Sequence, residues 1–239
     1  GSKVFLKDTL TTIGFFTDVQ YGDKIEWIPT IMGFDVSEWA TFQEIFGNNL
    51  VSCWTLDETS GTNVIDYGPG QQNNGTNNNV IVGVTSNTSS LGKAYFFNGT
   101  NNLLYNISMS ASSSLNISDV ALGIIFNTTD TEADMVGGKI NTGGYQLGIT
   151  TGKMFSKPVV SGQGDVVSGT TEVYTGYNVL AILSHTNANT SIYVNGSLET
   201  TTATTSGTLK NSPVWSIAGT NILGDFVGYV SEVWVLNAT

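Results

Sequence analysis

The sequence contains no arginine, and charged residues of both signs are scarce. Only 11% of the 239 residues are charged and all 8 basic residues are lysines, so the formal net charge is −11. Nucleic-acid binding is not expected, because phosphate contacts need clusters of Lys and Arg. Sites that grip a carboxylate or phosphate with a bidentate Arg fork are excluded, and with them sialidase-type glycosidases and arginine-finger phosphoryl transfer.

Cysteine, histidine and long apolar runs are also in short supply. Cys53 is the only cysteine, so no internal disulfide can form, and we expect a small buried hydrophobe there. His185 is the only histidine, and it offers no convincing catalytic triad or zinc centre. The longest apolar runs, such as 121–126, fall far below the ~18–20 residues that span a bilayer. We therefore expect no membrane insertion.

Polarity comes instead from Thr, Ser and Asn, which together supply 78 of the 239 residues. Hydrophobic residues make up 40% of the chain and aromatic residues 10%, which is enough to bury a core. The charge is unevenly placed: residues 67–118 contain no acid, and Lys93 is their only charged residue. A surface with so few ion pairs predicts that any ligand binds with weak salt dependence.

The pattern divides the chain into three parts. Gly1-Ser2 has the form of a cleavage scar left by protein expression. Residues 3–49 are predicted to form an N-terminal arm of short extended segments with one helix over 35–46, which Asp35 caps and Gly47 ends. Residues 50–239 are predicted to form one β domain.

That β domain shows about a dozen short β segments separated by Gly, Asn, Ser and Thr clusters, with no crossover helices. Asn-Gly turns such as Asn195-Gly196 are typical of tight hairpins. Many short strands of this kind predict an all-β fold with an antiparallel β-sandwich or jelly roll. The polar runs 71–79, 85–90 and 199–206 are predicted to be loop tips.

Five motifs in order suggest a family. They lie at 51–61 (VSCWTLDETSG), 66–76 (DYGPGQQNNGT), 92–102 (GKAYFFNGTNN), 192–197 (IYVNGS) and 226–237 (FVGYVSEVWVLN). Together they resemble the laminin-G-like jelly rolls of the concanavalin A-like lectin/glucanase superfamily, over about four fifths of the chain. The resemblance implies a concanavalin A-like jelly roll and glycan binding as the common activity. Residues 101–102 and Ser231 depart from the pattern because they lack its usual acids.

Three residues of these motifs carry structural expectations. Trp54 and Leu56 lie on one face of the first strand and should both be buried, each contributing roughly 2–3 kcal/mol. Glu232 lies among apolar residues, so we expect its carboxylate to accept backbone N–H bonds near a sheet end, since burying it unpaired would be costly.

Catalysis is not expected. The superfamily's glucanases place two carboxylates on one strand in patterns such as E-x-D-x-x-E, which sets them ~5 Å apart, and no such pattern occurs here. Asp130, Glu132 and Asp134 do alternate, but among Asn and Thr residues that are typical of a loop. They are interpreted as a solvated acidic turn or a calcium site.

No cofactor is expected to be required, and calcium is the one ion for which the resemblance suggests ligands. Ca²⁺ prefers six to eight oxygens from loop carboxylates and carbonyls. The candidate ligands are the loop acids Asp57, Asp66, Asp130 and Asp134.

Glycan binding needs an aromatic platform with amide and hydroxyl groups around it. Three places offer this combination, and ordinary loop polarity is the competing interpretation at each. The candidates are Tyr67 with Gln71, Asn73 and Asn74; Tyr145 with Asn141; and Tyr174 with Tyr177.

Two functions stay open. The first is a non-enzymatic binding module that recognises glycans or a receptor on a virion or cell surface. The second is a structural capsid, spike or appendage protein whose N-terminal segment mediates assembly as a homo-oligomer or with other virion subunits. Nine N-x-S/T sequons and the low charge favour an extracellular or virion-surface location in either case.

Overall fold

The fold is seen in a computed structural model that describes residues 5–6, 15–16, 46–85, 93–99, 106–110, 113–139, 144–160, 163–206, 209, 214–218 and 226–238. The predicted helix over 35–46 lies outside these residues except for Phe46, and so does nearly all of the predicted arm. No helix among the described residues is long and apolar enough to cross a membrane.

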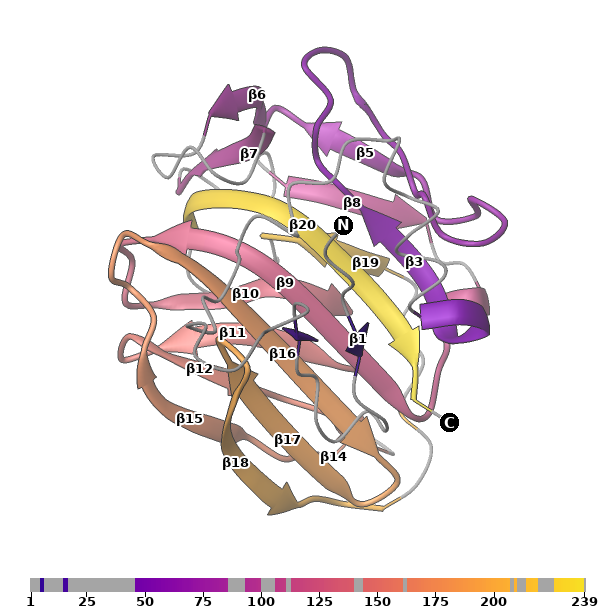
Figure 1. Cartoon of the computed structure of the whole chain (residues 1–239), viewed down its shortest axis with the longest axis vertical. Coiled ribbons are helices and arrows are strands. Elements are labelled where there is room, and N and C mark those ends of the chain that lie inside the picture. Colours follow the sequence, from indigo (N-terminus) through magenta and orange to yellow (C-terminus); the bar gives the residue numbers. More distant parts are fainter. Residues whose placement is uncertain are drawn as a thin grey trace.

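Two eight-stranded antiparallel sheets face each other (Figure 1). The front sheet has the order β18-β17-β16-β9-β20-β7-β6, and β3 also pairs with β20. Its strands are β3 (Leu50–Trp54), β6 (Ile81–Thr85), β7 (Lys93–Asn98), β9 (Val120–Thr128), β16 (Asn178–Thr186), β17 (Asn189–Val194), β18 (Ser197–Ala203) and β20 (Val227–Asn237).

The back sheet has the order β15-β12-β11-β10-β19-β8-β5-β4. Its strands are β4 (Asn63–Val64), β5 (Gly75–Asn78), β8 (Asn106–Ser110), β10 (Ala133–Lys139), β11 (Gln146–Thr150), β12 (Lys153–Ser156), β15 (Val167–Glu172) and β19 (Val214–Ile217). The remaining elements are short: β1 (Phe5–Leu6), β2 (Phe15–Phe16), β13 (Val159–Val160), β14 (Gln163–Gly164), and the 3-10 turns η3 (Gly47–Asn49) and η4 (Ser113–Leu115).

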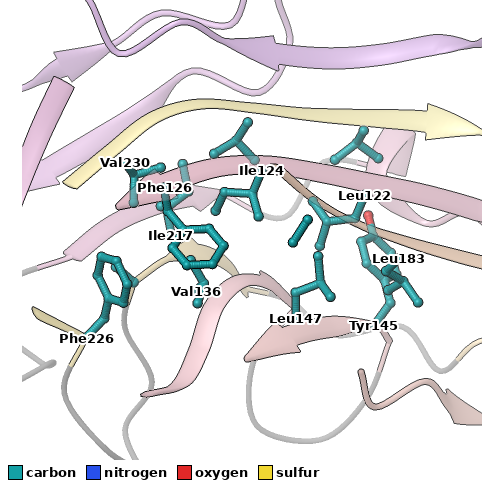
Figure 2. Close-up of a cluster of buried hydrophobic side chains, with 14 of the residues drawn as sticks. Leu122, Ile124, Phe126, Val136, Tyr145, Leu147, Leu183, Ile217, Phe226 and Val230 are labelled. Atoms are coloured by element: carbon teal, nitrogen blue, oxygen red, sulfur yellow. The ribbon is translucent and has the colours of Figure 1, made fainter. Parts of the chain in front are cut away.

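The core lies between the two sheets because side chains alternate along each strand. Leu122, Ile124 and Phe126 of β9 belong to the main buried cluster, whereas the neighbouring Ala121 and Ile125 are buried outside it. Figure 2 shows Phe126 close to Ile217, which comes from the back sheet. Such interdigitation of two inner faces forms the core of an aligned sandwich.

Aromatic rings pack against one another in the core, and one pair joins the two sheets. Trp54 of β3 stacks on Trp215 of β19 with ring centroids 4.9 Å apart. Phe226 meets Phe97 and Phe126 edge-on, at 5.8 and 6.2 Å. These geometries suit the quadrupoles of the rings and add to the free energy of burying their large apolar area.

The all-β antiparallel sandwich is confirmed, and so is the hairpin at Asn195-Gly196. Both turn residues have positive φ, +50° and +81°, as a two-residue turn between β17 and β18 requires. Trp54 and Leu56 are both fully buried in the core, although Leu56 follows the end of β3 and adopts φ +53°.

Two predicted loop tips were wrong. The run 71–79 contains β5, and the run 199–206 contains most of β18. β18 is an edge strand whose residues are exposed or half-buried, so it has no apolar alternation to reveal it. Threonine favours extended backbone through its β-branch, and that preference is enough at a solvated edge.

The expectation for Glu232 was also wrong. The side chain is only 1% exposed and lies beside a β-bulge in the middle of β20. Its Oε1 lies 4.0 Å from the Cys53 thiol, and among the described residues no backbone N–H donates to the carboxylate and Oε2 has no hydrogen-bond partner. The role expected of Glu232 is filled by Asp66.

Candidate functional site

Three loops meet at one end of the sandwich. Strands β9 and β16 are antiparallel neighbours with Asn127 opposite Asn178, so the loop after β9 and the loop before β16 emerge at the same end. The β11–β12 turn joins them there. We call residues 127–132, 150–152 and 173–178 the Tyr177 loop surface.

Hydrogen bonds hold the first two loops together. The Gly176 N–H donates to the Thr128 carbonyl at 3.0 Å, and the Asn127 amide donates to the Gly176 carbonyl at 2.8 Å. The Thr128 hydroxyl in turn donates to the carbonyl of Val227 at the start of β20. Because Asn127 and Thr128 are buried, these contacts are shielded from water and fix the backbone of the loops.

The β11–β12 turn is fixed in the same way. The Glu132 carboxylate accepts the Thr151 N–H at 2.8 Å, and the Gly152 N–H donates to the Thr131 carbonyl at 2.8 Å. The Tyr174 ring lies against Gly152, where a Cβ would stand 2.4 Å from the ring, and Gly152 has φ +73°. Glycine is therefore required at this position both for the backbone and for the ring.

The surface that results presents one large aromatic ring to solvent. Tyr177 is 70% exposed, while Tyr174 is half-buried beside Gly152. Thr129 and Thr175 are exposed on the same loops. An exposed ring held on ordered backbone, with hydroxyls around it, can pack against the apolar face of a sugar and hydrogen-bond its hydroxyls.

Sequence reasoning proposed Tyr174 with Tyr177 but did not connect them to the acidic run. The structure brings Asp130 and Glu132 to the same surface, on the loop that follows β9. Asp130 accepts the Glu132 N–H at 3.0 Å through Oδ1. The sequence contained a signal for this arrangement. The segments that form β9 and β16 are both long and apolar, and two such segments that pair as antiparallel neighbours place the end of one beside the start of the other.

The predicted site around Tyr67 is organised by Asp66, which is fully buried. Its Oδ1 accepts the N–H groups of Cys53 (3.0 Å) and Gly68 (2.8 Å). Its Oδ2 accepts the Asn73 N–H (3.1 Å) and the Ser52 hydroxyl (3.2 Å). The carboxylate thus ties the loop after β4 to strand β3.

The residues of this loop differ in exposure. Asn73 is buried, and its amide donates to the hydroxyls of Ser52 (2.6 Å) and Ser114 (3.0 Å). Gln71 and Asn74 are exposed, and Asn74 accepts the Asp66 N–H at 2.8 Å. The ligand prediction at this loop therefore depends on Gln71, Asn74 and the half-buried Tyr67.

Carboxylates lie near the Tyr67 ring. Burial, together with the nearby charges of Glu58 and Asp57, raises the pKa of Tyr67. The Tyr95 hydroxyl donates to Glu58 Oε2 at 3.0 Å, and burial followed by the Glu58 charge raises the pKa of Tyr95 strongly. Both phenols stay neutral donors at physiological pH.

The second predicted pair is not accessible as a pair. Tyr145 is a core residue whose hydroxyl donates to the Leu115 carbonyl at 3.4 Å, and burial raises its pKa. A ligand could not reach this side chain without opening the core. Asn141 lies outside the described residues.

The predicted calcium ligands are dispersed. Asp66 has its oxygens occupied by four donors, and Asp57 accepts the Lys93 N–H at 3.2 Å. Asp130 lies on the Tyr177 loop surface, and the side chain of Asp134 lies outside the described residues. Within the described ranges, no three His, Cys, Asp or Glu side chains are grouped to hold a metal ion. Calcium binding stays a prediction.

Comparison of the sequence finds no matching family model and no significantly similar curated protein. Comparison of the fold does find relatives. The binding domain of Paraclostridial Mosquitocidal Protein 1 matches with a TM-score of 0.61 and 12% identity, over 80% of this chain and 49% of that chain. A structure of botulinum neurotoxin type C matches with a TM-score of 0.59 and 8% identity, over 80% and 48%.

An enzyme shares the same architecture. Trypanosoma rangeli sialidase in complex with sialic acid matches with a TM-score of 0.57 and 14% identity, over 79% of this chain and 31% of that chain. The chain spans about half the length of the toxin structures and a third of the sialidase. At these identities the likeness concerns the fold alone. The chain has the β-sandwich found in toxin binding domains, and the narrower laminin-G-like assignment stays a prediction.

Proposed function

We propose that this chain is a non-enzymatic recognition module that binds a glycan through the Tyr177 loop surface. The observation that carries the proposal is Tyr177 itself, which is 70% exposed on a loop whose backbone is held by two hydrogen bonds of Gly176: its carbonyl accepts the Asn127 amide, and its N–H donates to the Thr128 carbonyl. A ring held on ordered backbone at a loop end can pack against the apolar face of a sugar without first being ordered, which favours a binding role.

The fold relatives support this proposal by analogy. The botulinum neurotoxin type C structure concerns cell entry through two ganglioside molecules, and another relative is a botulinum neurotoxin binding domain in complex with SialylT. The sialidase is a poor guide to chemistry here, since a chain without arginine cannot form an Arg clamp on a substrate carboxylate. We therefore propose binding without catalysis, at an extracellular or virion surface.

A glycan array of the intact chain, with and without EDTA, tests the proposal. We expect selective binding, and Tyr177→Ala should weaken it about five- to thirtyfold, because the ring contributes about 1–2 kcal/mol of contact. Val166→Ala is the matched control: Val166 is also largely exposed but lies outside the Tyr177 loop surface. Gln71→Ala tests the competing loop around Tyr67.

The outcomes separate the alternatives. Loss of binding in Gln71→Ala but not in Tyr177→Ala would move the site to the loop around Tyr67. Loss on EDTA treatment would support the calcium prediction. No binding in either condition, or a steep loss of affinity between low and high salt, would contradict the proposal.

A further inference from the structure

The charged side chains of the Tyr177 loop surface are both acidic. They are Asp130 and Glu132, and the surface contains no lysine. The lysine that follows it in the chain, Lys153, is the cross-strand partner of the exposed Glu172 on β15, and opposite charges at such positions attract each other. The residues of this surface therefore present a negative potential to a ligand, with the same sign as the net charge of −11 on the whole chain.

Backbone N–H groups around these side chains are already engaged. Those that donate to acceptors within the surface belong to Asp130, Glu132, Thr151, Gly152, Gly176 and Tyr177. A loop binds an anion without the help of a cation by pointing successive N–H groups at it. Because Gly176 and Tyr177 both use their N–H groups within the surface, the backbone beside the exposed ring does not offer such a nest.

One carboxylate oxygen of Asp130 is left for a ligand. Oδ1 accepts the Glu132 N–H at 3.0 Å, whereas no described residue donates to Oδ2. A Cβ built on Gly176 would stand 3.6 Å from Thr129 Cγ2, so the residue before Asp130 lies against the residue before Tyr177. Carboxylate oxygens accept strong hydrogen bonds from hydroxyl groups. The half-buried Asp130 can thus bind a hydroxyl of a sugar that packs on the ring.

We propose that the ligand of the Tyr177 loop surface is an uncharged glycan, and that Asp130 determines this specificity. The inference rests on the proposed function and narrows its ligand class. A neutral sugar donates a hydroxyl to Asp130 and uses the hydroxyls of Thr129 and Thr175 as further partners. A sialylated or sulfated sugar brings a negative charge beside two carboxylates, and neither a lysine of the surface nor an N–H nest at the ring compensates it. Specificity then comes from repulsion as well as from attraction.

Paired probes on one array test the ligand class. The array displays lactose, N-acetyllactosamine and mannose oligosaccharides, and the first two cores are also printed in terminally sialylated and sulfated forms. We expect the intact chain to bind neutral members, and to bind the anionic form of any such core about fivefold more weakly or worse. High salt should narrow this difference by screening the repulsion, while affinity for the neutral form stays constant. A preference caused by steric exclusion would not respond to salt.

Asp130→Asn tests the residue. Asparagine keeps an oxygen that can accept the Glu132 N–H, so the loop should be retained. The variant should bind the neutral probe about threefold to tenfold more weakly, because a neutral acceptor forms a weaker hydrogen bond. Its preference for the neutral over the sialylated form should shrink at least threefold, since one repelling charge is gone.

Asp119→Asn is the matched control. Asp119 is also half-buried and also accepts one backbone N–H, that of Asn187 at 2.7 Å, but it precedes β9 and lies at the opposite end of that strand from Asp130. Its replacement removes the same charge from the chain. Both affinities should therefore stay within about twofold of the wild type.

The outcomes distinguish this inference from the proposed function. A sialylated or sulfated form that binds as well as its neutral core, with Tyr177→Ala still abolishing binding, would overturn the inference and leave the proposed function standing. Unchanged affinities and preference in Asp130→Asn would overturn the role of Asp130. The absence of binding to every member of the array would overturn the proposed function and this inference with it.

Discussion

The indole of Trp234 lies directly over Gly123 in the middle of the front sheet. A Cβ built on Gly123 would stand 2.2 Å from Trp234 Cε2 and 2.3 Å from Cζ2. The two residues are cross-strand partners on β20 and β9. The indole of Trp234 thus fills the space that a side chain at position 123 would need, in the middle of a fully paired sheet.

Gly123→Ala should consequently destabilise the fold by about 2–3 kcal/mol, because the new methyl group forces a large ring out of a packed position. Gly137→Ala is the matched control. Gly137 is a buried strand glycine whose added Cβ would meet Ile124 at 3.5 Å, an ordinary contact. Chemical denaturation of both variants measures the difference, and equal stabilities would show that the indole can move away at little cost.

Asp66→Asn should be among the most destabilising single changes. The carboxylate accepts four hydrogen bonds in a fully buried position, and an amide would turn one acceptor into a donor that faces other donors. We expect a loss of about 2–4 kcal/mol in the free energy of unfolding. Asp130→Asn, which alters a carboxylate that accepts the Glu132 N–H on a loop, should change it by about 0.5 kcal/mol or less. Similar losses in both would argue against Asp66 as the anchor of its loop.

Glu232 should make the protein less stable as pH rises. Burial, and secondarily the charge of Asp57, raises the pKa of Glu232 well above its ordinary value of 4.5. The unfolded chain therefore loses this proton first, so the contribution is complete below pH 4.5 and is lost as pH rises through the raised pKa. Thermal unfolding of Glu232→Gln between pH 4 and 8 should show a growing advantage over the wild type.

The exposed Glu172 of β15 provides the control for that measurement. Glu172→Gln should follow the wild-type pH profile. If Glu232→Gln also follows it, then Glu232 is ionised in the folded protein and has a compensating partner.

His185 should make the protein less stable as pH falls, the opposite of the effect of Glu232. It is fully buried, with Nδ1 2.8 Å from the Thr190 hydroxyl, and Nε2 has no hydrogen-bond partner within the part of the chain that the structure describes. Burial lowers the pKa of His185 below its ordinary 6.5, although the charge of Asp119 opposes the shift. Its contribution is present above pH 6.5 and is lost as pH falls through the lowered pKa.

The unfolding temperature of the wild type should therefore drop more than that of His185→Gln as pH falls from 7.5 to 5. Proton uptake on unfolding at pH 6, measured by calorimetry in two buffers, gives a second readout. Parallel pH profiles for the two proteins would mean that the imidazole takes up its proton as readily in the folded protein as in the unfolded chain.

The sequence predicted local structure correctly where a backbone conformation is accessible to only a few residue types. Asn195 and Gly196 predicted their hairpin correctly, because few other residues accept positive φ at both positions. The long apolar segments that became β9, β16 and β20 were recognisable because most of their residues are buried on both faces of the strand. β18 was missed because an exposed Thr-rich edge strand lacks any apolar pattern.

The sites were harder to predict because their geometry is non-local. Asp66 and Asn73 look like ordinary loop residues, and only the fold brings them against Ser52 and Cys53 of β3. Tyr145 looked like a surface aromatic next to Asn141, but it fills the space between the sheets. Composition gives no information on which aromatic residue faces solvent, since burial depends on the partner strand.

The sequence by itself determined that this chain is a charge-poor, arginine-free antiparallel β-sandwich, since alternation and turn chemistry are local properties. Only the tertiary structure decided which carboxylates are buried, that Tyr177 stands at the loop end with Asp130 and Glu132, and that the front sheet is buried on both sides. Those facts depend on pairings between residues up to 179 positions apart, as between Cys53 and Glu232. Such pairings are fixed by packing of the whole chain, because no local preference encodes them.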